Sequence, residues 1–183
     1  MDSLRGYLLL AGADLHDPNF RRTVVLIGEH GDEGAMGVVL NRPSLIPVDE
    51  AVPPLVGLPG LAESDGVVYV GGPVQPDAIV VLADFDEPEH AGVLVFGSIG
   101  FLPGDVELQS VGELIRARVF AGYAGWGPGQ LEDELAVSSW IVEPARVDDV
   151  FSDEPGALWS AILQRKGGRF ALLARMPDDP RLN

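Results

Sequence analysis

The sequence predicts an α+β fold built around a curved mixed β-sheet, and three observations support this fold class. Apolar runs of strand length recur between glycines and prolines along most of the chain. Helical patterns are fewer, and they do not alternate regularly with the strand patterns as a doubly wound parallel sheet requires. The 183 residues, 46% of them hydrophobic, suffice for one domain, residues 1–183, that buries its own core.

Eight segments carry the strand pattern. The first contains the apolar run YLLLA, and the second contains VVLI, a continuous run that is typical of a strand buried on both faces. The polar loop GDEG at 31–34 separates the second segment from the third and suits a hairpin, so at least one antiparallel pair is expected. The stretch 44–66 is rich in proline and glycine, which excludes a long helix and predicts a flap. The predicted strands cover residues 6–11, 23–30, 35–41, 67–70, 78–83, 93–97, 118–122 and 140–142.

Helical patterns occur in three segments. Pro128 suits the first turn of the second of them. In the third, Leu158, Ile162 and Leu163 share one stripe, and Gly167 is placed to cap the C-terminus of the helix. The predicted helices cover residues 106–116, 128–137 and 156–165.

The residue composition excludes several kinds of chemistry. The chain has no cysteine, which removes catalytic thiols, thiolate zinc sites and iron–sulfur clusters. Its three histidines, His16, His30 and His90, are far apart in sequence and form no HExxH pair. Neither a GxSxG nucleophile motif nor a P-loop is present. We therefore expect no metal ion and no cofactor.

The charge balance constrains the partners and the location of the protein. An excess of 28 Asp and Glu over 12 Lys and Arg gives a formal net charge of -16. Nucleic acids present phosphates, and the densest basic cluster, Arg165, Lys166 and Arg169, does not override the overall negative charge, so we expect no direct binding of DNA or RNA. No apolar stretch approaches the roughly 20 residues of a membrane span, and YLLLAGA at 7–13 fits a buried strand better than a signal peptide. We expect a cytoplasmic protein with no membrane partner.

Two titratable residues end the second predicted strand. Glu29 and His30 are adjacent, so on a strand their side chains point in opposite directions and cannot act on each other as an acid–base pair. Either residue could act alone as an acid or a base. The alternative is that Glu29 binds a loop backbone.

Asn41 and Arg42 close the third predicted strand, directly before a proline that favours extended backbone. Arg42 could bind a carboxylate or phosphate through both ends of its guanidinium group, and Asn41 could bind an amide or a sugar hydroxyl. The alternative for Arg42 is an internal salt bridge with one of the 28 acidic residues.

A glycine-rich turn, GYAGWGPGQLEDEL at 122–135, joins a predicted strand to a predicted helix. Its four glycines allow the backbone to approach another strand or a ligand closely. The start of a helix can bind an anion, but acidic residues that include Glu132 already occupy the first turns. Trp126 and Gln130 could line a groove, and we expect the turn to pack against the strand that ends at Asn41.

Several motifs occur together in this chain. They are DPNF at 17–20, RTV at 22–24, EH at 29–30, GVVLNRP at 37–43, GGPV at 71–74 and GYAGWGPGQLE at 122–132. In the order and spacing of these motifs, the chain resembles the AlgH/YqgE family of bacterial proteins over almost its whole length. One departure is Ala13, where many members have proline, and it affects only the local turn.

The resemblance implies an α+β fold with a branched, mostly antiparallel mixed sheet rolled into a pseudo-barrel with flanking helices. It implies no particular activity. One branch of the family is labelled a transcriptional regulator of alginate synthesis, and such a label does not transfer with a fold.

Three functional hypotheses follow. The first is a binding or regulatory protein with a groove for a small molecule or a protein segment. The second is a hydrolase that uses Glu29 or His30, and the third, which the negative charge opposes, is a direct transcriptional regulator. The candidate groove residues are Glu29, His30, Asn41, Arg42, Gly71, Gly72, Trp126, Gln130 and Glu132.

Overall fold

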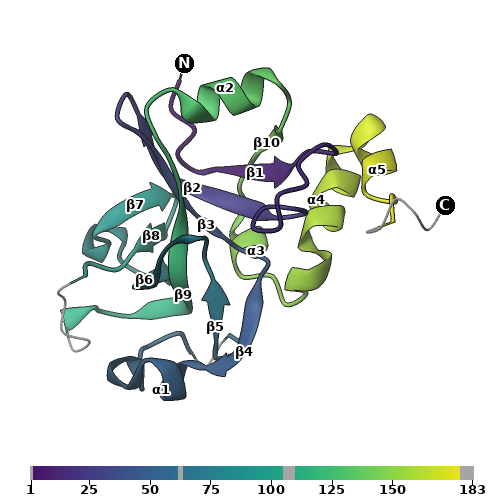
Figure 1. Ribbon diagram of the computed structural model, residues 1–183. Coiled ribbons are helices and arrows are strands. Elements are labelled where there is room, and N and C mark those ends of the chain that lie inside the picture. The colour runs from purple at the N-terminus through teal and green to yellow at the C-terminus, as the bar shows by residue number, and fades with distance from the viewer. Residues whose placement is uncertain (1, 62–63, 105–109, 178–183) are drawn as a thin grey trace.

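The computed structural model describes residues 2–61, 64–104 and 110–177, which form ten strands and five α-helices (Figure 1). The strands are β1 (Tyr7–Ala11), β2 (Val24–Gly31), β3 (Gly34–Val39), β4 (Pro43–Pro47), β5 (Val67–Val70), β6 (Val74–Phe85), β7 (Val93–Phe96), β8 (Ile99–Phe101), β9 (Leu114–Trp126) and β10 (Trp140–Pro144). The helices are α1 (Val48–Ala51), α2 (Gln130–Ala136), α3 (Val147–Val150), α4 (Leu158–Lys166) and α5 (Arg169–Leu173), and short 3-10 turns are η1 (Pro53–Leu55), η3 (Pro88–His90) and η5 (Pro155–Ala157).

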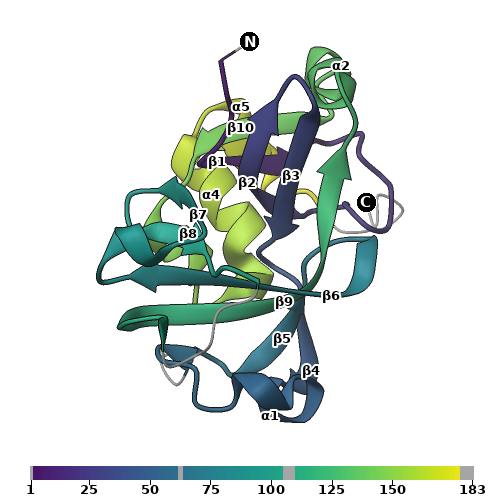
Figure 2. The same cartoon turned by 90° about the vertical axis from the view of Figure 1, so that its left-hand side faces the viewer.

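The strands form one branched sheet. Its main path runs in the order β10-β1-β2-β3-β9-β6-β8-β7, and all neighbours along this path are antiparallel. At the branch, β5 pairs with β9 in parallel, and β4 pairs with β5. The path keeps two separate ends, so the sheet curves without closing into a barrel (Figure 2). The predicted α+β class and the branched, mostly antiparallel sheet are confirmed.

Strands β1 and β2 are buried on both faces, which explains their unbroken apolar runs. Leu8 and Leu10 belong to a core cluster that α4 completes, whereas Leu9 and Ala11 belong to a second cluster with Trp140. Successive side chains on a strand alternate between its faces, so each strand contributes to both clusters. A third cluster is built on β5, β6 and β9 and extends to α1 and η1.

Two of the predicted helices are confirmed, as α2 and α4. Leu158, Ile162 and Leu163 of α4 are buried against the sheet, as their spacing indicates. Gly167 caps this helix, with a φ of +77° and an N–H that donates to the Leu163 carbonyl at 3.1 Å. Among the described helices, none is long and apolar enough to cross a bilayer.

The predicted helix at 106–116 is wrong where the structure describes it. Residues 106–109 lie outside the described residues, but Leu114 to Arg116 belong to β9, because Leu114 pairs with Phe85 and Arg116 with Asp84 of β6. The sequence pattern does not predict β4 or β8, since β4 begins and ends at proline and β8 has three residues. The described part of 44–66 contains only short elements, among them β4, α1 and η1.

Candidate functional site

Asn41 follows β3 and joins it to the start of β2. Its side-chain oxygen accepts a hydrogen bond from the Val24 backbone N–H at 2.9 Å, and its amide nitrogen donates to the Arg22 carbonyl at 2.9 Å. The same side chain thereby holds Arg22, whose φ of 54° is uncommon for a residue with a Cβ. Both polar ends of Asn41 are engaged in holding the entry to β2.

The Arg42 guanidinium group lies over the turn that precedes β2. Its Nη1 donates to the Pro18 carbonyl at 2.9 Å, and its Nη2 donates to the Arg21 carbonyl at 3.0 Å. Burial lowers the pKa of Arg42, and the charge of Asp17 opposes this effect by raising it. The partners that the structure describes for Arg42 are therefore backbone carbonyls, whereas the sequence suggested an acidic side chain.

Gly71 and Gly72 lie at the branch of the sheet, where two backbones pass close together. A Cβ added at Gly71 would lie 2.2 Å from the carbonyl oxygen of Gly122, and a Cβ at Gly72 would lie 2.2 Å from the carbonyl carbon of Tyr123. The Gly71 N–H also donates to the Ala121 carbonyl at 2.9 Å. Strand-to-strand contact thus accounts for glycine at both positions.

Glu134 of α2 brings two tryptophans and a glutamine together. Its Oε2 accepts hydrogen bonds from Trp126 Nε1 at 2.9 Å and from Trp140 Nε1 at 2.7 Å. Its Oε1 accepts one from Gln130 Nε2 at 3.0 Å. The two indole rings also pack edge to face, with centroids 6.0 Å apart. Trp126 and Gln130 therefore both donate to the Glu134 carboxylate, which links α2 to the sheet.

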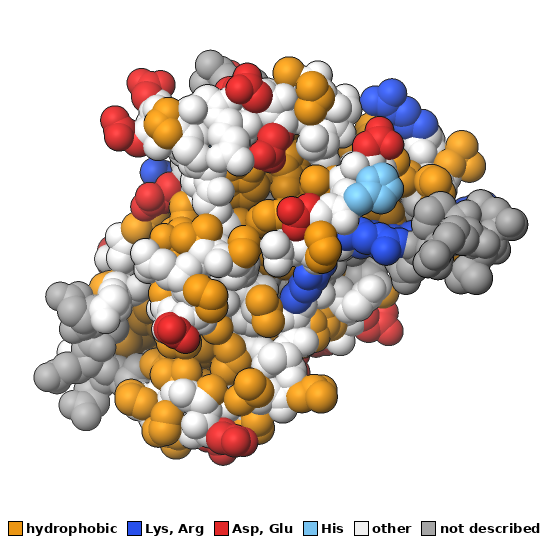
Figure 3. Space-filling model, in the orientation of Figure 1, with side chains coloured by type: hydrophobic (Ala, Val, Ile, Leu, Met, Phe, Trp, Pro, Cys, Tyr) orange, Lys and Arg blue, Asp and Glu red, His pale blue; other side chains and the backbone are white. Residues whose placement is uncertain are grey.

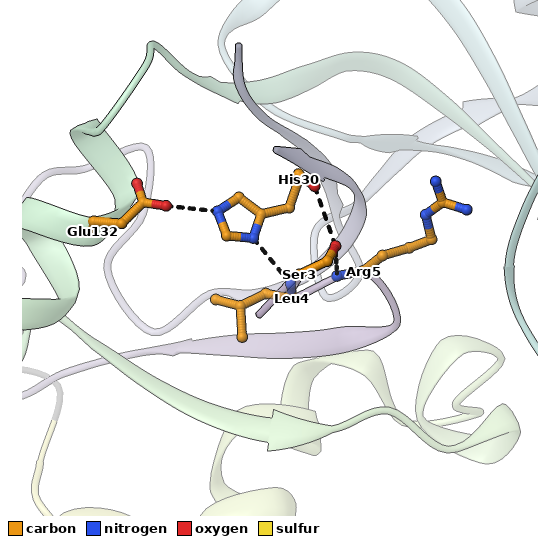
Figure 4. Close-up of polar contacts among 5 residues, drawn as sticks. All are labelled: Ser3, Leu4, Arg5, His30 and Glu132. Atoms are coloured by element: carbon orange, nitrogen blue, oxygen red, sulfur yellow. Dashed lines mark hydrogen bonds and ion pairs between the residues drawn. The ribbon is translucent and has the colours of Figure 1, made fainter. Parts of the chain in front are cut away.

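His30 and Glu132 meet beside the start of the chain (Figure 4). The Leu4 backbone N–H donates to Nδ1 of His30 at 2.9 Å, so Nδ1 must be unprotonated and Nε2 must carry the ring proton. Nε2 then donates to Oε1 of Glu132 at 2.9 Å. The side chain of His30 is only 3% exposed. Ser3 Oγ donates to the His30 carbonyl at 3.1 Å, and the cluster thereby holds the N-terminal segment.

This cluster offers limited catalytic capacity. A general base needs a ring nitrogen that can reach a substrate proton, and both nitrogens of His30 are engaged. Glu29 is exposed. The open hollow beside the cluster has a volume of about 300 Å³. No group of three or more metal-binding side chains occurs among the described residues.

The candidate residues occupy separate parts of the sheet. Ala35 near the start of β3 pairs with Trp126, whereas Asn41 and Arg42 follow the other end of the same strand. The glycine-rich turn does pack against β3, as expected, but away from Asn41. The structure therefore brings His30 to Glu132 and Trp126 to Gln130, and it places the two pairs apart from Asn41.

An apolar cleft is lined by none of the candidate residues that the sequence analysis named. It is an open hollow of about 320 Å³ between η1, β6 and the residues after β8. A second open hollow, of about 430 Å³, adjoins the other side of the α1–η1 segment. In Figure 3, hydrophobic side chains gather on the lower part of the molecule, around α1 and β4, and the visible Lys and Arg lie on the upper part and at the middle of this face. The side chains that line the cleft include Val52, Leu55, Ile79, Val80 and Leu102.

Comparison with known proteins places the chain in a family. The model of the AlgH-like family matches residues 8–171. The chain belongs to the AlgH-like family. A UPF0301 protein of Streptomyces avermitilis is 43% identical to this AlgH-like chain over an alignment 195 residues long. The alignment covers 100% of the chain and 97% of the relative. A UPF0301 protein of Thermobifida fusca is 42% identical, over 99% of the chain and 96% of the relative.

Two solved structures resemble this AlgH-like protein. The solution structure of the AlgH protein from Pseudomonas aeruginosa is 32% identical, with a TM-score of 0.71, and the match covers 97% of this chain and 96% of that one. A crystal structure of a Corynebacterium diphtheriae protein gives a TM-score of 0.84 at 24% identity, over 94% and 92% of the two chains. The latter likeness shows the fold alone, and both matches agree with the α+β sheet described above.

The sequence of this AlgH-like protein does not single out several residues that the structure makes important. Leu4 acts through its backbone N–H, which has no side-chain signature. Glu134 could have been found from its spacing, since it follows Gln130 by four residues and both then lie on one face of a helix. No sequence motif marks the apolar cleft. Ile79 lies in a predicted strand, and only the structure shows that its side chain is exposed.

We expect Glu132→Gln to destabilise this AlgH-like protein at neutral pH but not in acid. The hydrogen bond from His30 is the main cause of a lowered pKa of Glu132. A carboxyl group whose pKa is lower in the folded than in the unfolded protein stabilises the fold above its unfolded pKa, and the contribution disappears as the pH falls through the folded pKa. Urea unfolding should therefore show a stability difference at neutral pH that closes below the ordinary glutamate pKa of 4.5.

Glu33→Gln is the matched control for this measurement, because Glu33 is exposed. It should match the native protein at both pH values. A Glu132→Gln difference that stays the same in acid would contradict the assignment of the effect to the His30 hydrogen bond.

Proposed function

We propose that this AlgH-like protein is a binding protein that holds a segment of another protein in the apolar cleft. The observation that carries the proposal is the exposure of large apolar side chains around the cleft. Ile79 lines the cleft and is 42% exposed, Val56 lines the second hollow and is 58% exposed, and Leu45 on the nearby β4 is 96% exposed. Large exposed apolar side chains gathered on one part of a protein are typical of an interaction site.

A binding role agrees better with the polar residues than a hydrolytic role does. Asn41, Arg42 and His30 each use their polar atoms on partners within the chain. Catalysis needs convergent titratable groups that can reach a substrate, and the hollow beside His30 is framed by a ring whose two nitrogens are already engaged. We therefore favour the binding hypothesis over hydrolysis by Glu29 or His30.

The shape of the surface favours a protein segment over a small molecule. Pockets for small molecules enclose most of the ligand surface. Here the two hollows beside α1 and η1 are separate and open, with volumes of about 320 and 430 Å³. An extended or helical segment can place successive side chains in separate hollows, as it does in other peptide-binding grooves.

The proposal predicts that short amphipathic peptides bind at the apolar cleft. The probes are three peptides with leucine on one face of a helix and lysine, glutamine or glutamate on the other. In ¹⁵N-labelled protein, at least one of them should shift the amide signals of Val52, Leu55 and Ile79. Binding of none of the three, or shifts centred on His30 and Glu132, would overturn the proposed function.

Substitutions in the cleft, at Ile79, and in the hollow beside it, at Val56, sharpen this test. Ile79→Gln combined with Val56→Gln should weaken the tightest peptide about tenfold, because each side chain removes apolar contact. Val137→Gln combined with Leu172→Gln is the matched control, since these side chains are 74% and 69% exposed outside the cleft. The control should bind as the native protein does.

A further inference from the structure

One long segment of this chain contains no Lys or Arg at all. Residues 43–115, which we call the cation-free segment, contain twelve Asp and Glu, one His and no Lys or Arg. All 12 Lys and Arg of the protein therefore lie outside this segment. The segment includes β4 to β8 with α1 and η1. Of its acidic residues, the buried Asp84 lies 3.8 Å from Arg116 Nη2, just outside the segment. The exposed carboxylates of a segment without Lys or Arg give its surface a negative field.

The hollows of this region are lined by the cation-free segment alone. Every residue that lines the apolar cleft and the hollow on the other side of η1 falls within 43–115, and Asp49 lies on the latter. A third open hollow, of about 350 Å³, also falls entirely within the segment and carries Asp86 and Glu113. These three carboxylates are exposed, so they face whatever occupies the hollows.

The same segment carries most of the exposed apolar side chains. Eleven large hydrophobic residues are exposed in the described structure, and seven of them fall within 43–115. Leu45 and Ile46 on β4, which among the described strands pairs with β5 alone, are 96% and 50% exposed. Apolar contact and negative charge therefore coincide on one part of the molecule.

We infer that the segment bound by this surface is cationic as well as apolar, with Lys or Arg residues interspersed among large hydrophobic ones. The inference rests on the proposed function and adds the charge of the partner. Apolar side chains would fill the hollows, while the cations would face Asp49, Asp86 and Glu113. Complementary charge of this kind accelerates association and selects among partners of similar hydrophobicity.

Charge also disfavours the other occupants. A second copy of this chain would bring the same exposed carboxylates, among them Asp49, Asp86 and Glu113, against one another if the two surfaces met symmetrically. Nucleic acids and anionic bilayers would meet the same repulsion. A cationic polypeptide is the partner that the surface attracts both by charge and by apolar contact.

The test compares the affinities of the three leucine-rich peptides. The lysine peptide should bind most tightly, the glutamine peptide more weakly and the glutamate peptide not measurably. The affinity of the lysine peptide should fall as the salt concentration is raised, because salt screens the attraction between exposed charges. A duplex oligonucleotide and vesicles of anionic phospholipid serve as additional probes and should not bind.

Neutralising the carboxylates locates the effect. Asp49→Asn, Asp86→Asn and Glu113→Gln together should weaken the lysine peptide about tenfold and leave the glutamine peptide unchanged. The control combines Asp133→Asn, Asp153→Asn and Glu33→Gln, three exposed residues outside the cation-free segment. It removes the same charge but should leave the affinity of both peptides unchanged. All six residues are exposed, so both variants should remain folded.

The possible failures are distinguishable. If no peptide binds, the proposed function fails and the inference fails with it. If the glutamine or glutamate peptide binds as tightly as the lysine peptide, the proposed binding function is kept and the inferred preference for a cationic segment is overturned. Equal weakening by the two triple variants would assign the effect to the overall charge and overturn the inference, as would binding of the oligonucleotide or the anionic vesicles.

Discussion

Gly72→Ala is expected to destabilise the protein by more than about 3 kcal/mol, through crowding and backbone strain together. The φ of Gly72 is +152°, and the added Cβ would lie 2.2 Å from the Tyr123 carbonyl carbon and 2.4 Å from the Ala124 nitrogen. Both atoms belong to the backbone of β9, which pairs with β3, β5 and β6. Relief of the clash therefore requires a shift of the strand that joins the branches of the sheet. Chemical denaturation measures the loss.

Gly57→Ala separates crowding from backbone strain. Gly57 has a φ of +83°, but a Cβ there would meet no atom within 4 Å. Its replacement should cost only about 1–2 kcal/mol, the ordinary penalty for a side chain in the left-handed region. If Gly72→Ala is no more destabilising than Gly57→Ala, close approach of the strands is not the reason for glycine at position 72.

Asn41→Ala is expected to lower the free energy of unfolding by about 2–3 kcal/mol, the cost of leaving buried polar groups without partners. The Val24 N–H would lose its acceptor, and Val24 is fully buried. The Arg22 carbonyl would lose its donor at a residue whose positive φ is itself unfavourable. Thermal and chemical unfolding should both register the change.

Asn19→Ala provides the control for Asn41, because Asn19 is exposed in the turn before β2. It should change stability by no more than about 0.5 kcal/mol. If the Asn41→Ala protein is as stable as the native protein, the structural role of Asn41 is contradicted. Asn41 would then again be a candidate for contact with a ligand.

Local sequence patterns predicted the strands and helices whose own residues show which of their faces are buried. The apolar runs of β1 and β2 could be read directly, because both faces of these strands are covered. The stripe of α4 could be read for the same reason. The start of β9 could not, since its strand conformation depends on pairing with β6, and nothing in the local pattern at 114–116 reports a partner about thirty residues away.

The motif residues were found, but not their contacts. Asn41 and Arg42 bind backbone groups, and backbone groups have no signature in the sequence. His30 reaches Glu132 across 102 residues, a pairing that strand periodicity cannot foresee. The cation-free segment, by contrast, can be read from the sequence alone, because charge segregation does not depend on the fold. Its coincidence with the open hollows required the structure.

The arrangement of the sheet also determines when it can form during synthesis. Strand β1 pairs along its whole length with β10, and the indole of Trp159 donates to the Ala11 carbonyl 148 residues earlier in the chain. While the ribosome is still making the second half, β1 therefore lacks one neighbour and β3 lacks β9. Most of the core must assemble after the last strands emerge, and such distant pairing slows folding. The nascent chain thus carries apolar strands with one edge unpaired until β9 and β10 have been made.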